Sequence, residues 1–147
     1  MINVNFFEWD EIDDNDLLFA VIVSRFQSKW ILAKHKDRET WEIPGGHREK
    51  GEEITITASR ELQEETGAKE FKLMPICIYS VTKEDSDITK HPASTFGGLY
   101  FAEVTEIGDL PNLEIEEIQF FDNLPSELTY PEIQPCLLDK VIKYIND

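Results

Sequence analysis

The amino-acid sequence predicts an α/β fold, because strand-like apolar runs are interleaved with two segments of helical periodicity. Leu17–Phe26 is a continuous run rich in Val and Ile, as expected of a strand covered on both faces. Ile54–Thr66 has helical character and is followed by Gly67, at the position typical of a helix C-terminal glycine. Near the end of the chain, apolar residues repeat at helical spacing and indicate a second helix: Ile133, Leu137, Leu138, Val141, Ile142 and Ile145.

The segment before the first helix contains two further strand-like runs. Gln27–Lys29 indicates a turn between Leu17–Phe26 and the short apolar run Trp30–Ala33, so these segments predict a hairpin. Trp41–Ile43 alternates like a brief strand. Pro44–Gly46 follows it, and because proline removes a donor and glycine permits unusual dihedrals, a functional loop is expected to begin there.

The region after the first helix predicts the rest of the sheet. Phe71–Thr82, Leu99–Thr105 and Ile115–Phe121 have the composition of strands. The polar connection 83–92 is long enough for a lid or substrate contact, and an ordinary solvated loop is an equal alternative. No repeat or linker divides the chain, so residues 1–147 are expected to form a single domain.

Composition excludes several classes of protein. The longest uninterrupted apolar run, Leu17–Val23, is far shorter than the roughly 20 residues of a membrane-spanning helix. The acid-rich start of the chain lacks the features of a secretory signal, so a cytoplasmic protein without membrane contact is expected. Cys77 and Cys136 belong to no zinc or disulfide pattern, and both are expected to be buried thiols.

The charge balance bears on the partner. Lys and Arg total 14 and Asp and Glu total 30, which gives a formal net charge of −16. Such a surface repels polyphosphate backbones, so binding to nucleic-acid polymers is not expected. A small phosphorylated substrate remains compatible with this charge if a bound cation reverses the local field.

The predicted helix carries a cluster of carboxylates close to its apolar stripe. On a helical wheel, Ile54, Ala58 and Leu62 form that stripe, and Glu61 and Glu65 lie within or beside it. A solvated acidic face would instead lie opposite the stripe. Glu64 adjoins the other two glutamates, and i, i+3 and i, i+4 spacing brings such side chains to about 5–6 Å.

This spacing has an electrostatic cost that a cation would offset. At an effective dielectric of 20, one pair of like charges at that distance costs roughly 3 kcal/mol. Oxygen-only ligands select hard cations such as Mg²⁺ and Mn²⁺ over zinc. From the spacing alone, a metal site and a network of salt bridges are equal alternatives.

The residues around these glutamates decide between the two alternatives. Gly46, Glu52 and the segment Arg60–Ala68 (RELQEETGA) resemble the Nudix signature G-x5-E-x7-R-E-U-x-E-E-x-G-U, where U is a bulky aliphatic residue. All seven fixed positions match, and at roughly 10% per position the chance of this from one start is about 10⁻⁷. Ala68 is smaller than the residue usual at the last position.

The resemblance implies a metal-dependent enzyme. By similarity to the family, Glu61, Glu64 and Glu65 coordinate Mg²⁺, with Mn²⁺ as a substitute, and the backbone carbonyl of Gly45 adds a ligand. Arg60 in such proteins orients a signature glutamate, here its i+4 partner Glu64. The resemblance also implies the Nudix α/β/α sandwich, with a mixed β-sheet between helices.

The general base has several candidates, because Nudix enzymes take it from the signature helix or from a later loop. Glu65 is the first candidate. Glu114, Glu116 and Glu117 precede or begin the last predicted strand, and Glu117 is favoured among them by the likeness of Glu117–Phe121 to the family.

The resemblance predicts the reaction more sharply than the substrate. It implies hydrolysis of a nucleoside diphosphate linked to another group, and the compact length favours a nucleoside triphosphate, including an oxidised one, cleaved to monophosphate and pyrophosphate. A nucleotide sugar or dinucleotide is the alternative. The available phosphate contacts are Arg25, Lys34, His35, Arg38, Lys90 and His91, and the available stacking residues are Trp41, Phe120 and Phe121; Arg38, Arg25 and Phe120 are the first choices.

Two other classes of protein compete with an enzyme. A Nudix-fold module that binds a nucleotide without hydrolysing it is one, and the intact signature acids argue against it. An acidic Ca²⁺-binding protein is the other, but Asp10–Asp16 lacks the glycine-centred loop of an EF-hand.

Overall fold

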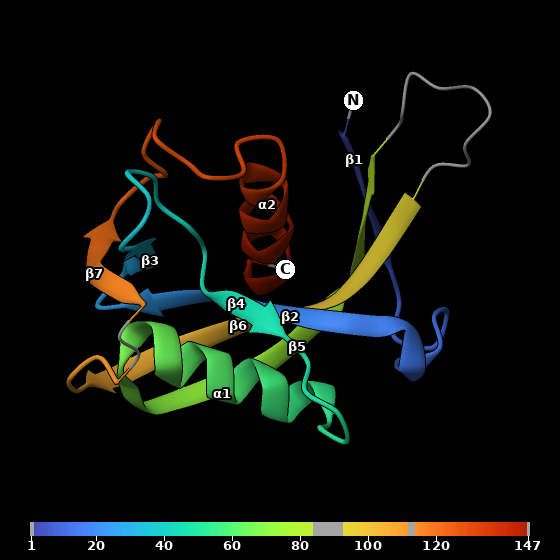
Figure 1. The fold of residues 1–147 in the computed structure, drawn as a ribbon, viewed down its shortest axis with the longest axis horizontal. Coiled ribbons are helices and arrows are strands. Elements are labelled where there is room, and N and C mark those ends of the chain that lie inside the picture. The colour runs from blue at the N-terminus through green and yellow to red at the C-terminus, as the bar shows by residue number, and fades with distance from the viewer. Residues whose placement is uncertain (1, 84–92, 112–113, 147) are drawn as a thin grey trace.

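The computed structural model describes residues 2–83, 93–111 and 114–146. Within these ranges the protein is a mixed β-sheet with one helix on each face (Figure 1). The elements follow the order β1 (Ile2–Phe7), a 3-10 turn (Asp14–Asp16), β2 (Leu17–Phe26), β3 (Lys29–His35), β4 (Gly45–His47), α1 (Ile54–Thr66), β5 (Ala68–Lys83), β6 (Ala93–Ile107), β7 (Ile115–Phe121) and α2 (Gln134–Ile145).

The sheet has the order β1-β5-β6-β2-β3-β7, and β4 pairs with β2 outside this path. β2 and β6 are parallel, and the other pairs are antiparallel. The predicted turn at Gln27 and Ser28 is present: both residues have positive φ, as a tight two-residue hairpin requires, and Phe26 pairs with Lys29. The mixed sheet between helices confirms the fold class that the sequence predicts.

Each face of the sheet has its own core. On one face, Ile54, Ala58 and Leu62 of α1 pack against sheet residues such as Ile22 and Tyr100. On the other face, the predicted apolar stripe of α2 packs through Leu137, Leu138 and Val141. The central strands are buried on both sides, which explains their uninterrupted apolar sequence.

Helix α1 has the predicted bounds. Gly67 ends it in the left-handed conformation with φ of 77°, and its N–H donates to the carbonyl of Gln63. A side chain at Gly67 would also collide with the carbonyl oxygen of Gly108 at 2.7 Å. The β-branched residues at the start of α1 are also helical. Packing of Ile54 against the sheet outweighs their strand propensity.

Four sequence predictions need correction. Trp41 and Glu42 form only isolated bridges, and the regular strand begins at Gly45, inside the segment predicted as a loop. Gly45 can pair with β2 because it has no side chain: a Cβ at this position would lie 2.6 Å from the carbonyl oxygen of Ala20 on β2. The alternating segment Ile2–Phe7 forms β1, which was not predicted. Strands β5 and β6 are longer than predicted. The polar connection predicted at 83–92 begins with Lys83, which is the last residue of β5, and the rest of it lies outside the described residues.

The remaining correction concerns the cysteines. Cys77 is buried, and burial raises its pKa to about 11. Cys136 is exposed on α2, so the prediction that it is buried was wrong. Its position follows from the helical period: Leu137, Leu138 and Val141 face the sheet, and position 136 lies outside that stripe. Among the described helices, none is both long and apolar enough to cross a membrane.

Candidate active site

The signature residues meet where β4 approaches helix α1. The buried stripe of α1 includes Glu61 and Glu65, whose residues are 8% and 5% exposed, as the wheel predicts. The side chain of Glu64 is 41% exposed. Gly46 faces Glu61 so closely that a Cβ at this glycine would overlap the carboxylate. The glycine is therefore required by the close approach of strand to helix.

Glu65 is tied to β4 by its own hydrogen bond. Its Oε1 accepts from the backbone N–H of Gly45 at 3.0 Å, and its Oε2 lies 3.6 Å from Nε2 of His35. Burial raises the pKa of Glu65 to about 8, and the nearby carboxylates of Glu61 and Glu42 add to this. A positive charge beside Glu65 would favour its ionised form.

Arg60 occupies the centre of the carboxylate cluster. Its Nη1 lies 2.8 Å from Glu61 and 3.3 Å from Glu64, so the predicted i+4 contact is present. Its Nε and Nη2 donate to Glu52 at 2.8 and 3.0 Å. Glu52 also accepts from Thr57, and these bonds lower its pKa to about 2, with the bond from Arg60 as the largest cause. Glu52 thus anchors Arg60, and the structure gives it a clearer role than the sequence did.

The cluster suits a hard divalent cation by its chemistry. Its donors are carboxylate oxygens, which Mg²⁺ and Mn²⁺ prefer. Burial raises the pKa of Glu61 as well as that of Glu65, and a cation would offset the cost of keeping both ionised. Within the described part of the chain, no three acidic, histidine or cysteine side chains already converge as a metal site, and Arg60 pairs with both Glu61 and Glu64.

The backbone of Gly45 is compatible with the predicted role of its carbonyl. In the β2–β4 ladder, backbone bonds run from Ile22 N to Pro44 O, next to the pair Val21 and Gly45, and from Arg48 N to Leu18 O, three pairs from it. Antiparallel ladders alternate, so both polar backbone groups of Gly45 point away from β2. Its N–H is used by Glu65 on that side.

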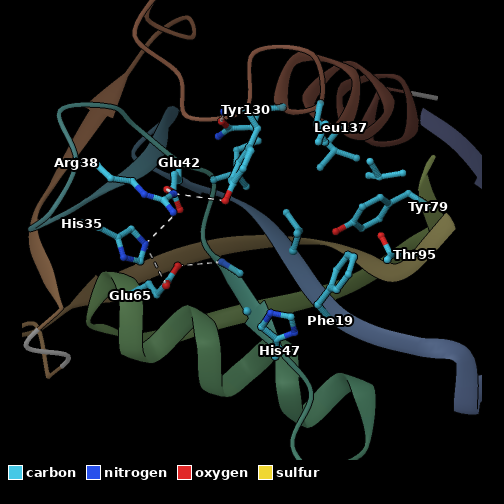
Figure 2. A pocket seen from close by; sticks show the side chains of 17 residues that line it. Phe19, His35, Arg38, Glu42, His47, Glu65, Tyr79, Thr95, Tyr130 and Leu137 are labelled. Carbon is cyan, nitrogen blue, oxygen red and sulfur yellow. Dashed lines mark hydrogen bonds and ion pairs between the residues drawn. The ribbon is translucent and has the colours of Figure 1, made fainter. Parts of the chain in front are cut away.

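A pocket of about 400 Å³ opens beside Glu65 (Figure 2). Its polar end contains Glu65, His35, Glu42 and Arg38, linked in series: His35 lies 3.2 Å from Glu42, and Arg38 pairs with Glu42. Its other end lies under α2 and is mainly apolar, with the following lining residues: Phe19, Val21, Ile43, Tyr79, Val81, Ile133, Gln134 and Leu137. A volume of this size and mixed lining is typical of a small-molecule site.

The predicted substrate contacts divide into two groups. Arg38 lines the pocket, with its guanidinium also 3.4 Å from the hydroxyl of Tyr130. Arg25 does not line it and instead forms an ion pair of 2.7 Å with Glu103. Phe120 is also outside the lining and packs against Phe26 with a centroid distance of 5.5 Å. The structure therefore brings only Arg38 of these three to the pocket.

The remaining candidates for substrate contacts are also separated. His35 lines the pocket, whereas Lys34 pairs with Glu116 and Glu117. Trp41 and Phe121 pack against each other. Lys90 and His91 lie outside the described residues.

Glu117, the alternative base, is not among the residues that line the pocket. It pairs with Lys34 in the β3–β7 ladder, and its carboxylate lies 3.6 Å from Nζ of that lysine. The neighbouring Ile118 packs on the α1 face, so strand alternation directs Glu117 to the α2 face, where it pairs with Lys34 and does not line the pocket. Among the candidates, Glu65 alone both lines the pocket and belongs to the signature.

Sequence reasoning missed several lining residues. Glu42 was assigned only to a strand, although its position before Pro44 and Gly45 places it next to the signature loop. Tyr79 and Gln134 gave no usable signal, because an isolated tyrosine in a strand and a glutamine at a helix start are ordinary residues there. Only the packing of α2 over the sheet brings them to one pocket.

Comparison with solved structures identifies the fold. The Bacillus subtilis pyrophosphohydrolase BsRppH (E68A mutant) superposes with a TM-score of 0.76 at 24% identity, over 97% of this chain and 90% of that one. A UDP-X diphosphatase gives a TM-score of 0.67 at 21% identity, over 88% of this chain and 63% of that one. Because both structures are less than 25% identical to this chain, the likeness shows only that the fold is shared.

Sequence comparison adds relatives from Bacillus subtilis. A protein described as a candidate 8-oxo-dGTP diphosphatase, YtkD, is 32% identical over 109 residues, which are 74% of this chain and 64% of that protein. A second candidate 8-oxo-dGTP diphosphatase is 33% identical over 90 residues, 61% of this chain and 60% of that protein. The chain thus spans somewhat less than two thirds of these relatives. The NUDIX domain model matches residues 15–137, and the chain belongs to the Nudix family.

Proposed function

We propose that this protein is a Mg²⁺-dependent pyrophosphohydrolase that cleaves a nucleoside triphosphate, including an oxidised one, to the monophosphate and pyrophosphate. The observation that carries this proposal is the pocket itself. Its polar end adjoins the signature carboxylates and its other end offers an apolar wall. A nucleotide has the same two parts, a charged phosphate chain and a flat, largely apolar base.

Glu61, Glu64 and Glu65 are the residues that would hold the cation, with the carbonyl of Gly45. When bound, Mg²⁺ or Mn²⁺ supplies positive charge to the phosphate oxygens and lowers the pKa of bound water. This also explains how a protein of net charge −16 accepts an anionic substrate.

The chain's own residues complete the chemistry. Glu65 is the proposed base, because it is the signature carboxylate that lines the polar end of the pocket. Burial raises its pKa to about 8, so the positive charge of the cation would be needed to keep it ionised and able to accept a proton from water. Arg38 is the cationic group at the polar end and His35 is a further possible donor, and both can contact phosphate oxygens if Glu42 releases them. Arg60 positions the carboxylates and does not line the pocket.

The substrate proposal draws on the relatives named as candidate 8-oxo-dGTP diphosphatases. A diphosphate ester is the second candidate, since a Bacillus subtilis ADP-ribose pyrophosphatase is 32% identical over 109 residues, 71% of this chain and 59% of that protein. Both substrates share a nucleoside diphosphate, so the proposed cleavage is the same.

Product analysis tests the proposal. The protein would be incubated with Mg²⁺ and either nucleoside triphosphates or diphosphate sugars, and early products would be followed by phosphorus NMR. Pyrophosphate and monophosphate from the triphosphates are expected. Orthophosphate as the first product would contradict the proposed cleavage, and turnover of the sugars alone would contradict the choice of substrate. Binding without turnover of any substrate would identify a non-catalytic module.

A further inference from the structure

The loop between β4 and α1 (Figure 1), residues 48–53, carries Glu52, which accepts hydrogen bonds from two arginine side chains. Arg60 of α1 donates to the Glu52 carboxylate at 2.8 and 3.0 Å, and to the carbonyl oxygen of His47 at 3.0 Å. Arg48 donates from its Nε to the backbone carbonyl oxygen of Glu52 at 2.6 Å. Glu52 is therefore fixed at both its side chain and its backbone.

The other two nitrogens of the Arg48 guanidinium reach the start of β2. Nη1 lies 2.7 Å from the carbonyl oxygen of Asp14 and 3.3 Å from that of Leu17, and Nη2 forms an ion pair of 2.8 Å with the Asp14 carboxylate. The Arg48 side chain is only 18% exposed. A planar guanidinium holds several acceptors at fixed angles, so this side chain ties the 3-10 turn, β2 and the loop together.

Arg48 is the side chain that links this loop to β2. Gly51 has a φ of 78° and allows the loop to turn, and bonds of 3.1 Å from Glu52 N to Glu49 O and from Glu49 N to Glu52 Oε1 close the turn. Those bonds remain within the loop. Of residues 48–53, all of which the structure describes, only Arg48 has a side chain bonded to β2 or to the 3-10 turn. Loss of this side chain would leave the Glu52 backbone without its direct anchor.

From these contacts we propose that Arg48 is a positioning residue for the metal site. Arg48 fixes the backbone of Glu52, the Glu52 carboxylate holds Arg60, and Arg60 holds the carboxylates of Glu61 and Glu64 at 2.8 and 3.3 Å. The inference rests on the proposed function, because it concerns how the cation of that function is bound. It assigns a role to a residue that neither lines the pocket nor supplies a ligand.

Loss of Arg48 has two opposed consequences for a bound cation. Removal of a positive charge strengthens cation binding through Coulomb's law. Loss of the anchor weakens it, because carboxylates with a less ordered support bind a metal less tightly. The second consequence should dominate, since the Arg48 charge is already paired with Asp14 at 2.8 Å. Direct partners of metal ligands affect affinity by about 10- to 100-fold, and Arg48 is further removed, so Arg48→Met should raise the metal Kd by roughly 3- to 10-fold.

A metal titration without substrate tests this inference. Mn²⁺ would be titrated into the folded protein, and the free ion would be measured by its electron paramagnetic resonance signal. Binding that is weakened in Glu61→Gln identifies the site and separates it from other acidic groups of the surface. A higher Kd for this site in Arg48→Met is expected, and an unchanged or lower Kd would overturn the inference.

Two further variants separate position from charge. Lys50→Met removes a positive charge from the same loop, where the exposed Lys50 side chain has no hydrogen-bond or ion-pair partner among the described residues. It is expected not to weaken Mn²⁺ binding. Arg48→Lys keeps the charge and loses the planar fork, so its Kd should also rise. Weakening in Lys50→Met equal to that in Arg48→Met, or a wild-type Kd in Arg48→Lys, would overturn the inference.

A double-mutant cycle tests the route from Arg48 to the carboxylates. In a Glu52→Ala background the route is already broken, so adding Arg48→Met should raise the Mn²⁺ Kd no further. Independent effects that multiply would contradict a role through Glu52. Circular dichroism and Tm would check that each variant is folded, and Arg48→Lys decides the question if Arg48→Met is unfolded. A purely structural role would lower Tm without changing the Kd of the folded protein.

Kinetics separate this inference from the proposed reaction. Arg48→Met should raise the Mg²⁺ concentration for half-maximal activity and leave KM for the nucleotide unchanged at saturating Mg²⁺, because Arg48 does not line the pocket. Weaker Mn²⁺ binding in Arg48→Met, in a protein that cleaves no nucleotide, would support the inference and refute only the proposed function. Cleavage as proposed, with equal Mn²⁺ binding in Arg48→Met and the wild type, would overturn the inference alone.

Discussion

The Glu65 carboxylate accepts a hydrogen bond of 3.0 Å from the backbone N–H of Gly45, twenty residues earlier in the chain. This bond joins the last turn of α1 to β4 and holds the proposed base at the polar end of the pocket. Its geometry directs the first prediction.

Glu65→Gln is expected to lower turnover by at least about 10²-fold and to leave the fold intact. The glutamine keeps an oxygen for the Gly45 N–H but cannot accept a proton from water. Steady-state kinetics with circular dichroism of the folded variant would measure both effects. Glu117→Gln is the matched control outside the pocket lining, with Glu114→Gln and Glu116→Gln beside it. Near-normal turnover in Glu65→Gln with a large loss in Glu117→Gln would transfer the role of base to Glu117.

Glu61→Gln and Glu64→Gln are expected to raise the Mg²⁺ concentration for half-maximal activity by about 10-fold or more, because each removes a proposed ligand. Their stabilities without metal should differ. Burial raises the pKa of Glu61, so its ionised form disfavours the folded state at neutral pH, and Glu61→Gln should be as stable as the wild type or more so. The Glu64 side chain is 41% exposed, and its loss should change stability by about 0.5 kcal/mol or less. A metal requirement unchanged in both variants would contradict the site.

The two adjacent glycines should respond differently to alanine. At Gly46 the added Cβ meets the flexible end of Glu61, so the carboxylate can move, and turnover should fall by about 10-fold with little change in Tm. At Gly45 the Cβ meets the backbone of Ala20, which cannot yield without moving β2. Overpacking of this kind costs about 1–3 kcal/mol, so Tm should fall by several degrees. Thermal unfolding and kinetics would be measured on both variants. A large fall in Tm for Gly46→Ala, with none for Gly45→Ala, would contradict the prediction.

The interaction of Glu52 with Arg60 should appear in the pH dependence of stability. The pKa of Glu52 is lowered to about 2, so its contribution is fully present above its unfolded pKa near 4.5 and is lost as pH falls towards 2. Glu52→Gln should therefore have a lower Tm than the wild type at pH 6, and the difference should shrink below pH 4.5. Glu49→Gln is the control, because Glu49 is 68% exposed and lies 3.7 Å from Arg60. A difference in Tm that is constant from pH 6 to pH 3 would exclude the ionic contribution.

The sequence by itself determined the family, both helices and the acidic cluster. These features are local: the signature residues lie within 46–68, and the helical period that buries Glu61 and Glu65 follows from a spacing of 3.6 residues per turn. Gly67 ended α1 where predicted, because the left-handed conformation is accessible to glycine at little cost. The hairpin at Gln27 and Ser28 was likewise encoded in adjacent residues.

Tertiary structure decided which distant residues share the pocket. Arg25 and Arg38 are alike as candidates in sequence, but Glu103 on a neighbouring strand pairs with Arg25, and only Arg38 reaches the pocket. Tyr79 and Gln134 meet the same pocket because α2 packs over the sheet and Gly97 leaves room for the rings of Phe19 and Tyr79. Such contacts depend on strand order and on the path of the chain, which no local pattern encodes. The signature residues were therefore enough to predict the class of reaction. The residues that line the pocket and would select a substrate could be identified only from the tertiary structure.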